Sequence, residues 1–161
     1  MTEIPDNSAT LNYFEDTMKN FIVEKLSHIE NWWNSCIPQE IRKDASQRHE
    51  RDKKINDVLN KPNYEVIDYI NFDGYEKIIL RRDNWRDHFE RVFLDKTVFG
   101  YKMRVVLSLR NDIRHGRGLD EINNTRLRLH CYDILSQIHE SMHDGSYNSD
   151  ALAEKLGFET Q

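Results

Sequence analysis

The sequence predicts an all-α fold, a four- to five-helix up-and-down bundle. Three observations favour this class. Only six glycines and three prolines interrupt the 161 residues. Apolar residues recur at helical spacing, with few alternating runs typical of strands. The interruptions leave only short connections between helical segments. A chain of this length can bury one core without a disulfide or a metal.

The first predicted helix is long and amphipathic and runs from Thr10 to Trp33. Its apolar residues at helical spacing are Leu11, Phe14, Met18, Phe21, Ile22, Leu26, Ile29, Trp32 and Trp33. Residues 1–9 are polar, and we expect them to form a flexible N-terminus. Pro38 resets the chain and fits the first turn of the next helix.

Residues 39–60 are very polar, and we interpret them as a solvated helix with a break near residues 46–50. Its thin apolar stripe consists of Ile41, Ala45, Ile55, Val58 and Leu59. We interpret its charge run as a water-exposed face. Pro62 is expected to end this helix.

The segment after Pro62 is a short helix or an extended connector, because a strand would have no obvious partner in this chain. Phe72-Asp73-Gly74 predicts a turn, with Asp73 as the N-cap of a helix that continues through Leu80. The following helix presents one apolar face, made of Trp85, Phe89, Val92 and Phe93. We assign the tryptophan, tyrosine and phenylalanine side chains, including Trp32, Trp33 and Trp85, to the core rather than to base stacking.

The next helix is expected over residues 97–116, with Gly116 and Gly118 as its C-terminal stop. Its predicted buried side is Met103, Val106, Leu109 and Ile113. Asp120 or Asn124 begins the last long helix, which ends at Gly145. Its predicted inner residues are Leu127, Cys131, Ile134, Leu135, Ile138 and Met142.

A short helix at about residues 149–156, capped by Ser149 and stopped by Gly157, closes the chain. The predicted organisation is therefore a helical domain over residues 10–145 and a C-terminal tail over residues 146–161.

The totals limit the class of protein. The chain has 23 basic and 28 acidic residues and a net charge of −5, which argues against general coating of nucleic acid but allows a local basic site. Cys36 and Cys131 lie far apart and predict two reduced thiols. We find no secretion signal and no run near the ~20 apolar residues of a membrane helix, so we expect a cytoplasmic protein.

The end of the 97–116 helix concentrates positive charge. From Lys96 to Gly118 there is one acidic residue, Asp112, and the six basic residues are Lys96, Lys102, Arg104, Arg110, Arg114 and Arg117. On an ideal helix Arg110, Arg114 and Arg117 fall within about 60° of one another.

Asn111 and His115 share the neighbouring face of this helix. Guanidinium groups match phosphate oxygens, and imidazole moves protons near neutral pH. The helix dipole would account for only one or two of the arginines. The pattern therefore favours phosphate chemistry.

Arg110, Asn111 and His115 in "RNDIRHG" resemble the signature of the HEPN superfamily: an arginine, a polar residue and a histidine at the end of a helix. The preceding "YINFDGYEKIILRRDNWRDHFERVF" is also similar to HEPN domains of nuclear messenger-surveillance endoribonucleases and their prokaryotic relatives. The resemblance covers about residues 10–143.

This resemblance implies a bundle that dimerises through the motif helix and cuts RNA in a shared cleft, with no metal and no cofactor. Arg110 would bind the scissile phosphate, His115 would act as general acid or base in attack by the RNA 2′-hydroxyl, and Asn111 would orient either group. Arg114 and Arg117 would bind substrate. Because Arg110 and His115 lie about 140° apart on an ideal helix, a composite site across a homodimer or an unwound last turn is expected.

The resemblance leaves a second function open, a non-catalytic dimerisation or RNA-binding module of a larger nucleic-acid-processing or defence system. Relatives paired with an antitoxin often carry a tyrosine two residues after the histidine, where this chain has Arg117.

A remote alternative is a zinc metallopeptidase, because His139 to His143 reads HExxH. No third histidine follows and no sheet is predicted, so we expect both histidines to meet solvent at a polar helix end.

Overall fold

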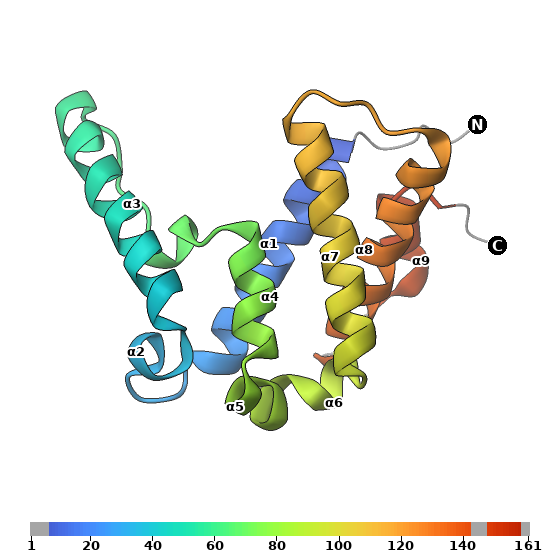
Figure 1. Cartoon of the computed structure of the whole chain (residues 1–161), viewed down its shortest axis with the longest axis horizontal. Coiled ribbons are helices and arrows are strands. Elements are labelled where there is room, and N and C mark those ends of the chain that lie inside the picture. The colour runs from blue at the N-terminus through green and yellow to red at the C-terminus, as the bar shows by residue number, and fades with distance from the viewer. Residues whose placement is uncertain (1–6, 143–147, 159–161) are drawn as a thin grey trace. The chain divides into compact units, whose positions relative to one another are not determined.

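The computed structural model describes residues 7–142 and 148–158 (Figure 1). The regular structure of these residues is helical throughout, without a strand, which confirms the predicted all-α class. The first six residues and Gly145 lie outside the described residues. Within the described part of the chain, no helix has both the length and the apolar character that crossing a bilayer requires.

The chain divides into two compact units, one of residues 18–87 and the other of residues 1–17 with 88–161. The boundaries fall within α1 (Asn7–Leu26) and within a π-helical turn, η2 (Trp85–Phe89). The division cuts across the predicted 10–145 domain, so that range and the up-and-down bundle stay predictions.

The unit of residues 18–87 is built around the second half of α1. Its other elements are α2 (Trp32–Cys36), α3 (Gln39–Leu59), the 3-10 turn η1 (Val66–Tyr69), α4 (Phe72–Leu80) and α5 (Arg82–Asn84). Fully buried side chains are Met18, Phe21, Ile22, Leu26, Ile37, Ile78 and Ile79. The buried Asn84 amide donates to the carbonyls of Cys36 and Ile78, each at 2.8 Å, and so ties α5 to α4 and to the end of α2.

Two predicted helix boundaries and one predicted burial in this unit are wrong. The first helix ends at Leu26 rather than Trp33, because Asn31 adopts a left-handed φ of 57° and restarts the chain as α2. Helix α3 is continuous and has no break near residues 46–50; it ends one residue before the left-handed Asn60. Trp32 and Trp33 are half-buried rather than core.

The predicted turn at residues 72–74 is instead the first turn of α4, with Asn71 rather than Asp73 at the N-cap. Gly74 is needed for packing, since an added Cβ would lie 2.7 Å from Cγ2 of Ile70. The sequence shows a glycine but not the side chain pressed against it.

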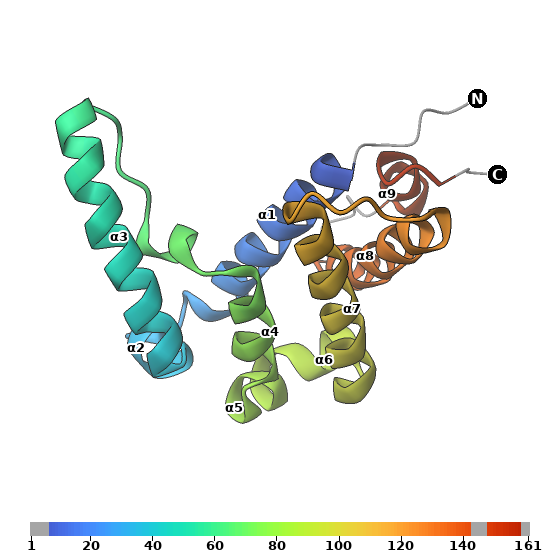
Figure 2. The same ribbon diagram turned by 45° about the horizontal axis from the view of Figure 1, so that its top comes forward.

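The unit of residues 1–17 with 88–161 centres on a pair of long helices, α7 (Lys96–Arg114) and α8 (Glu121–Ser141), which lie side by side (Figure 2). Asp95 caps α7 and Asp120 caps α8, as predicted for Asp120. The first half of α1, α6 (Glu90–Phe93) and α9 (Ser149–Lys155) complete the unit. Its fully buried side chains include Phe14, Phe89, Met103, Val106, Leu127, Cys131, Ile134, Leu135 and Ile138.

Most predicted inner positions of this unit are confirmed, with a few exceptions. Ile113 is half-buried rather than buried, and Met142 is 36% exposed. Tyr101 is 62% exposed and Tyr64 of the other unit is 63% exposed, so neither belongs to the core. Asn148, not Ser149, caps α9, while Gly157 follows its end with a φ of 83°. Both cysteines are free and buried, and burial raises the pKa of the Cys131 thiol, so it stays protonated.

Candidate functional site

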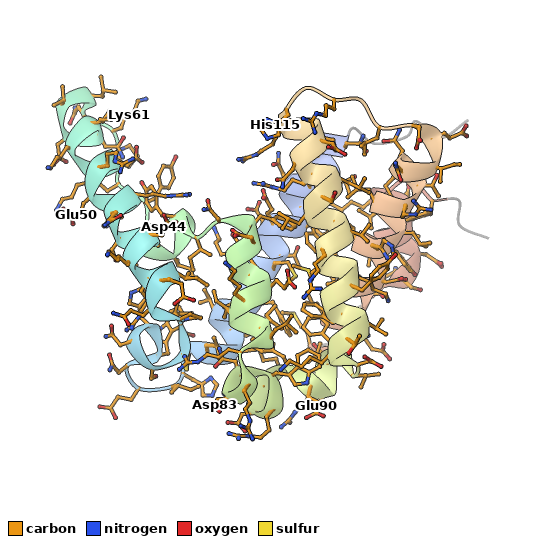
Figure 3. The ribbon with its side chains drawn as sticks, in the orientation of Figure 1. Asp44, Glu50, Lys61, Asp83, Glu90 and His115 are labelled. Atoms are coloured by element: carbon orange, nitrogen blue, oxygen red, sulfur yellow. The ribbon has the colours of Figure 1, made fainter. Side chains whose placement is uncertain are left out.

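The candidate site lies on the last two turns of α7 and the residue after it. Phe99, Met103, Val106 and Leu109 bury one side of this helix. Near the C-terminal end of the helix, Asn111 and Arg114 are exposed. Figure 3 shows His115 at that end, where the chain turns toward α8. The apolar stripe therefore fixes the helix and leaves its polar end open to solvent.

A Schellman motif ends the helix and fixes the backbone of His115. The Gly116 N–H donates to the Ile113 carbonyl at 3.1 Å, and the Arg117 N–H donates to the Asp112 carbonyl at 2.8 Å. Gly116 has a φ of 73°, which confirms its predicted role as the stop. His115 is the C-cap, and its N–H donates to the Asn111 carbonyl at 3.0 Å.

Arg110 has the most enclosed side chain of the candidate residues, with 12% of it exposed. Its Nε donates to Oε1 of Glu15 on α1 at 2.8 Å, and Nη1 donates to Oδ1 of Asn111 at 3.5 Å. Glu15 is itself 24% exposed. This partly buried, charge-assisted bond sets the plane of the guanidinium group.

Sequence reasoning missed Glu15. It lies 95 positions before Arg110 and follows the buried Phe14, so nothing local marks it as a partner of the helix end. The only signal in the sequence is that Glu15 lies at helical spacing from the apolar Leu11 and Met18. A carboxylate next to a buried helix face needs a cation, so this weakly predicts an ion-pair partner.

Arg114 and His115 differ from Arg110 in that both are exposed. Within the described residues, neither side chain has a hydrogen bond or an ion pair. They can meet a ligand without first breaking an internal contact.

Arg117 does not continue the helical face that the ideal geometry gave it. The helix ends at Arg114, and the left-handed Gly116 turns the chain before Arg117. Arg117 instead pairs with Asp112 at 3.3 Å, with 71% of its side chain exposed. The substrate-binding role of Arg117 stays a prediction. Arg110 and Arg114 both lie within α7, one turn apart, as the sequence predicted.

The HExxH segment can be followed only at its first histidine, because His143 lies outside the described residues. Nε2 of His139 lies 3.1 Å from the Tyr13 hydroxyl and the residue is half-buried, so His139 meets solvent only in part. Among the described residues, no group of three histidine, cysteine or carboxylate side chains is placed to hold a metal ion.

Comparison of the chain with models of protein families, with curated proteins and with solved structures gives no match. The similarity to the HEPN superfamily therefore depends on residues 110–115 and the segment before them, and it stays a prediction.

Proposed function

We propose that the protein is a metal-independent endoribonuclease with a composite Arg/His site formed across a homodimer. The observation that carries the proposal is the open end of α7, where the free side chains of Arg114 and His115 follow the positioned guanidinium of Arg110. Although the chain is acidic overall, this end of α7 holds arginines, which bind phosphate, and an imidazole, which exchanges protons near neutral pH.

The reaction needs two proton transfers, one from the attacking 2′-hydroxyl and one to the departing 5′-oxygen. A histidine acting as base removes the 2′-hydroxyl proton, the 2′-oxygen attacks phosphorus, and the bond to the 5′-oxygen breaks. The departing 5′-oxygen takes a proton from an acid, which leaves a 2′,3′-cyclic phosphate and a 5′-hydroxyl. Arg110 stabilises the charge on the phosphoryl oxygens, Asn111 orients the phosphate or the imidazole, and Arg114 and Arg117 bind the flanking strand.

The different surroundings of Arg110 and His115 support a site shared by two copies. In one chain, Arg110 is held against α1 by Glu15, whereas His115 is exposed beyond the end of the helix. A twofold axis near the end of α7 would set the arginine of one copy beside the histidine of the other.

The test is cleavage of a single-stranded RNA by the purified protein in EDTA, with the product ends identified. The proposal predicts cyclic phosphate ends and 5′-hydroxyl ends. Mixing Arg110→Ala with His115→Ala protein should then restore roughly a quarter of the wild-type activity, because half of randomly exchanged dimers keep one intact site of two. Failure to cut any RNA removes the proposal, and no recovery on mixing removes the composite site.

One observation favours a second function, a non-catalytic dimerisation or RNA-binding module. The ion pair with Glu15 gives Arg110 a structural role that needs no substrate. This alternative predicts RNA binding or dimerisation without cutting. The ribonuclease proposal includes RNA and a second copy of the chain as partners in the cytoplasm, whereas the second function needs only one of them. An antitoxin or a larger defence-system protein is a candidate further partner, although Arg117 stands where antitoxin-paired relatives often carry a tyrosine.

A further inference from the structure

The C-terminal part of α3 exposes apolar side chains that its own unit does not cover. Ile55 is 54% exposed, Val58 85% and Leu59 54%, whereas Ile41 and Ala45 near the other end of the helix are buried. The three exposed residues, named the α3 stripe here, are spaced by three and four positions and so share one face. The face of α3 that was predicted to be water-exposed therefore also carries three apolar side chains. Contact with water alone does not explain why they are there.

One flank of the α3 stripe is already occupied within the unit. The Tyr69 hydroxyl of η1 and the Asn56 amide both donate to Asp52. The Asn56 amide also donates to Asn63, in the segment that follows the helix. These hydrogen bonds hold the segment after α3 against the helix, and they satisfy the side-chain donors and acceptors that take part in them.

Two exposed cations lie on the same face of α3 as the stripe. With Val58 at 0° on an ideal helix, Arg51 lies at about 20°, between Val58 and Ile55 at about 60°, and Lys54 lies at about −40°, on the other side of Val58. Within the described residues neither cation has an ion pair or a hydrogen bond. Both line a hollow together with Ser46, Gln47 and Glu50, and the Glu50 carboxylate lies about 80° from Val58, outside Lys54. Figure 3 shows Glu50 partway along α3 and Lys61 just after it.

We propose that the α3 stripe, together with Arg51 and Lys54, binds an acidic amphipathic helix of another protein. Apolar residues at this spacing fit the ridges of a second helix, whose own stripe would cover Ile55, Val58 and Leu59. Glutamate or aspartate side chains beside that stripe would meet Arg51 and Lys54. The proposal is independent of the ribonuclease site.

Two other occupants fit the same surface less well. In an antiparallel pair of two copies of α3, each copy would bring its own Arg51 and Lys54 to the shared face, so four cations would enter one interface. RNA offers phosphates for those cations, but its bases stack on aromatic rings rather than on aliphatic side chains. Neither occupant uses the charge and the apolar stripe together.

The experiment measures binding of a labelled synthetic amphipathic peptide to the full chain by fluorescence anisotropy. One peptide has a leucine stripe flanked by glutamates, and its matched control has lysines in their place. The glutamate peptide should bind more tightly, and Val58→Asp should weaken it roughly tenfold. The double variant Arg51→Glu/Lys54→Glu should reverse the preference and select the lysine peptide.

Circular dichroism should show that the variants keep their helix, since the substituted side chains are exposed. Equal binding of both peptides, or wild-type binding by Val58→Asp, would overturn the proposal. Self-association that Val58→Asp abolishes would overturn it in favour of a second copy. Loss of RNA affinity on Val58→Asp would overturn it in favour of RNA.

Discussion

The C-terminal ends of α7 and α3 both display cations on an acidic protein, but they differ in where their apolar residues go. On α7 the stripe is buried as far as Leu109, and the exposed end is polar, with Asn111, Arg114 and His115. On α3 the last three apolar residues, Ile55, Val58 and Leu59, are exposed. Positive charge alone therefore does not determine what a surface binds. We propose phosphate as the ligand of the first end and an apolar, acidic partner as the ligand of the second.

The largest expected difference between the two helix ends is in RNA cleavage after a guanidinium is removed from each. Arg110→Ala should lower RNA cleavage by at least about 100-fold, because a donor aimed at developing charge is lost. Arg51→Ala on α3 is the matched control and should leave the rate unchanged. If Arg110→Ala does not fold, Arg110→Lys keeps the charge without the planar fork and should still cut poorly. Equal losses in the two alanine variants would contradict the assignment of the two ends.

The two ends of α3 should contribute differently to the stability of the protein. Ile41 is buried, so Ile41→Ala should lower the free energy of unfolding by about 2–4 kcal/mol through lost contacts and a cavity. Val58→Ala should change it by less than about 0.5 kcal/mol, because Val58 contributes little burial to the fold. Urea denaturation measures both values. A large loss for Val58→Ala would mean that the chain itself covers this surface.

The end of α7 depends on one backbone conformation. Gly116→Ala should lower the free energy of unfolding by about 1 kcal/mol, since alanine is strained at a φ of 73°. Gly118→Ala is the control. Neither glycine has an atom within 4 Å of an added Cβ, so only the backbone of Gly116 distinguishes them. Thermal unfolding of the two variants tests this, and equal shifts would contradict it.

The smallest expected effect is on the pH dependence of stability. Burial lowers the pKa of His130, which Asp133, Lys102 and Arg126 also influence. The unfolded chain then binds a proton more readily than the folded chain, so the free energy of unfolding should fall as the pH drops below about 6.5. His130→Gln should flatten that slope. An unchanged slope would show that other groups set it.

Sequence patterns predicted the structural features that depend on residues close together in the chain. The helical class, the buried faces of α7 and α8 and the Gly116 stop follow from spacing and from cap residues. The break at Asn31 depends on a left-handed backbone conformation, and the packing at Gly74 depends on where the Ile70 side chain lies, and the spacing of apolar residues shows neither. The same limit explains why Arg110 was predicted but Glu15, its partner from a distant helix, was not.

The most direct test of the central claim is the rate of RNA cleavage by His115→Ala in EDTA, beside His28→Ala, which replaces an exposed histidine in the other unit. His115→Ala should form the same dimer and produce no cyclic phosphate ends, while His28→Ala should cut like the wild type. Wild-type cutting by His115→Ala would contradict the assignment of the α7 end as the catalytic site.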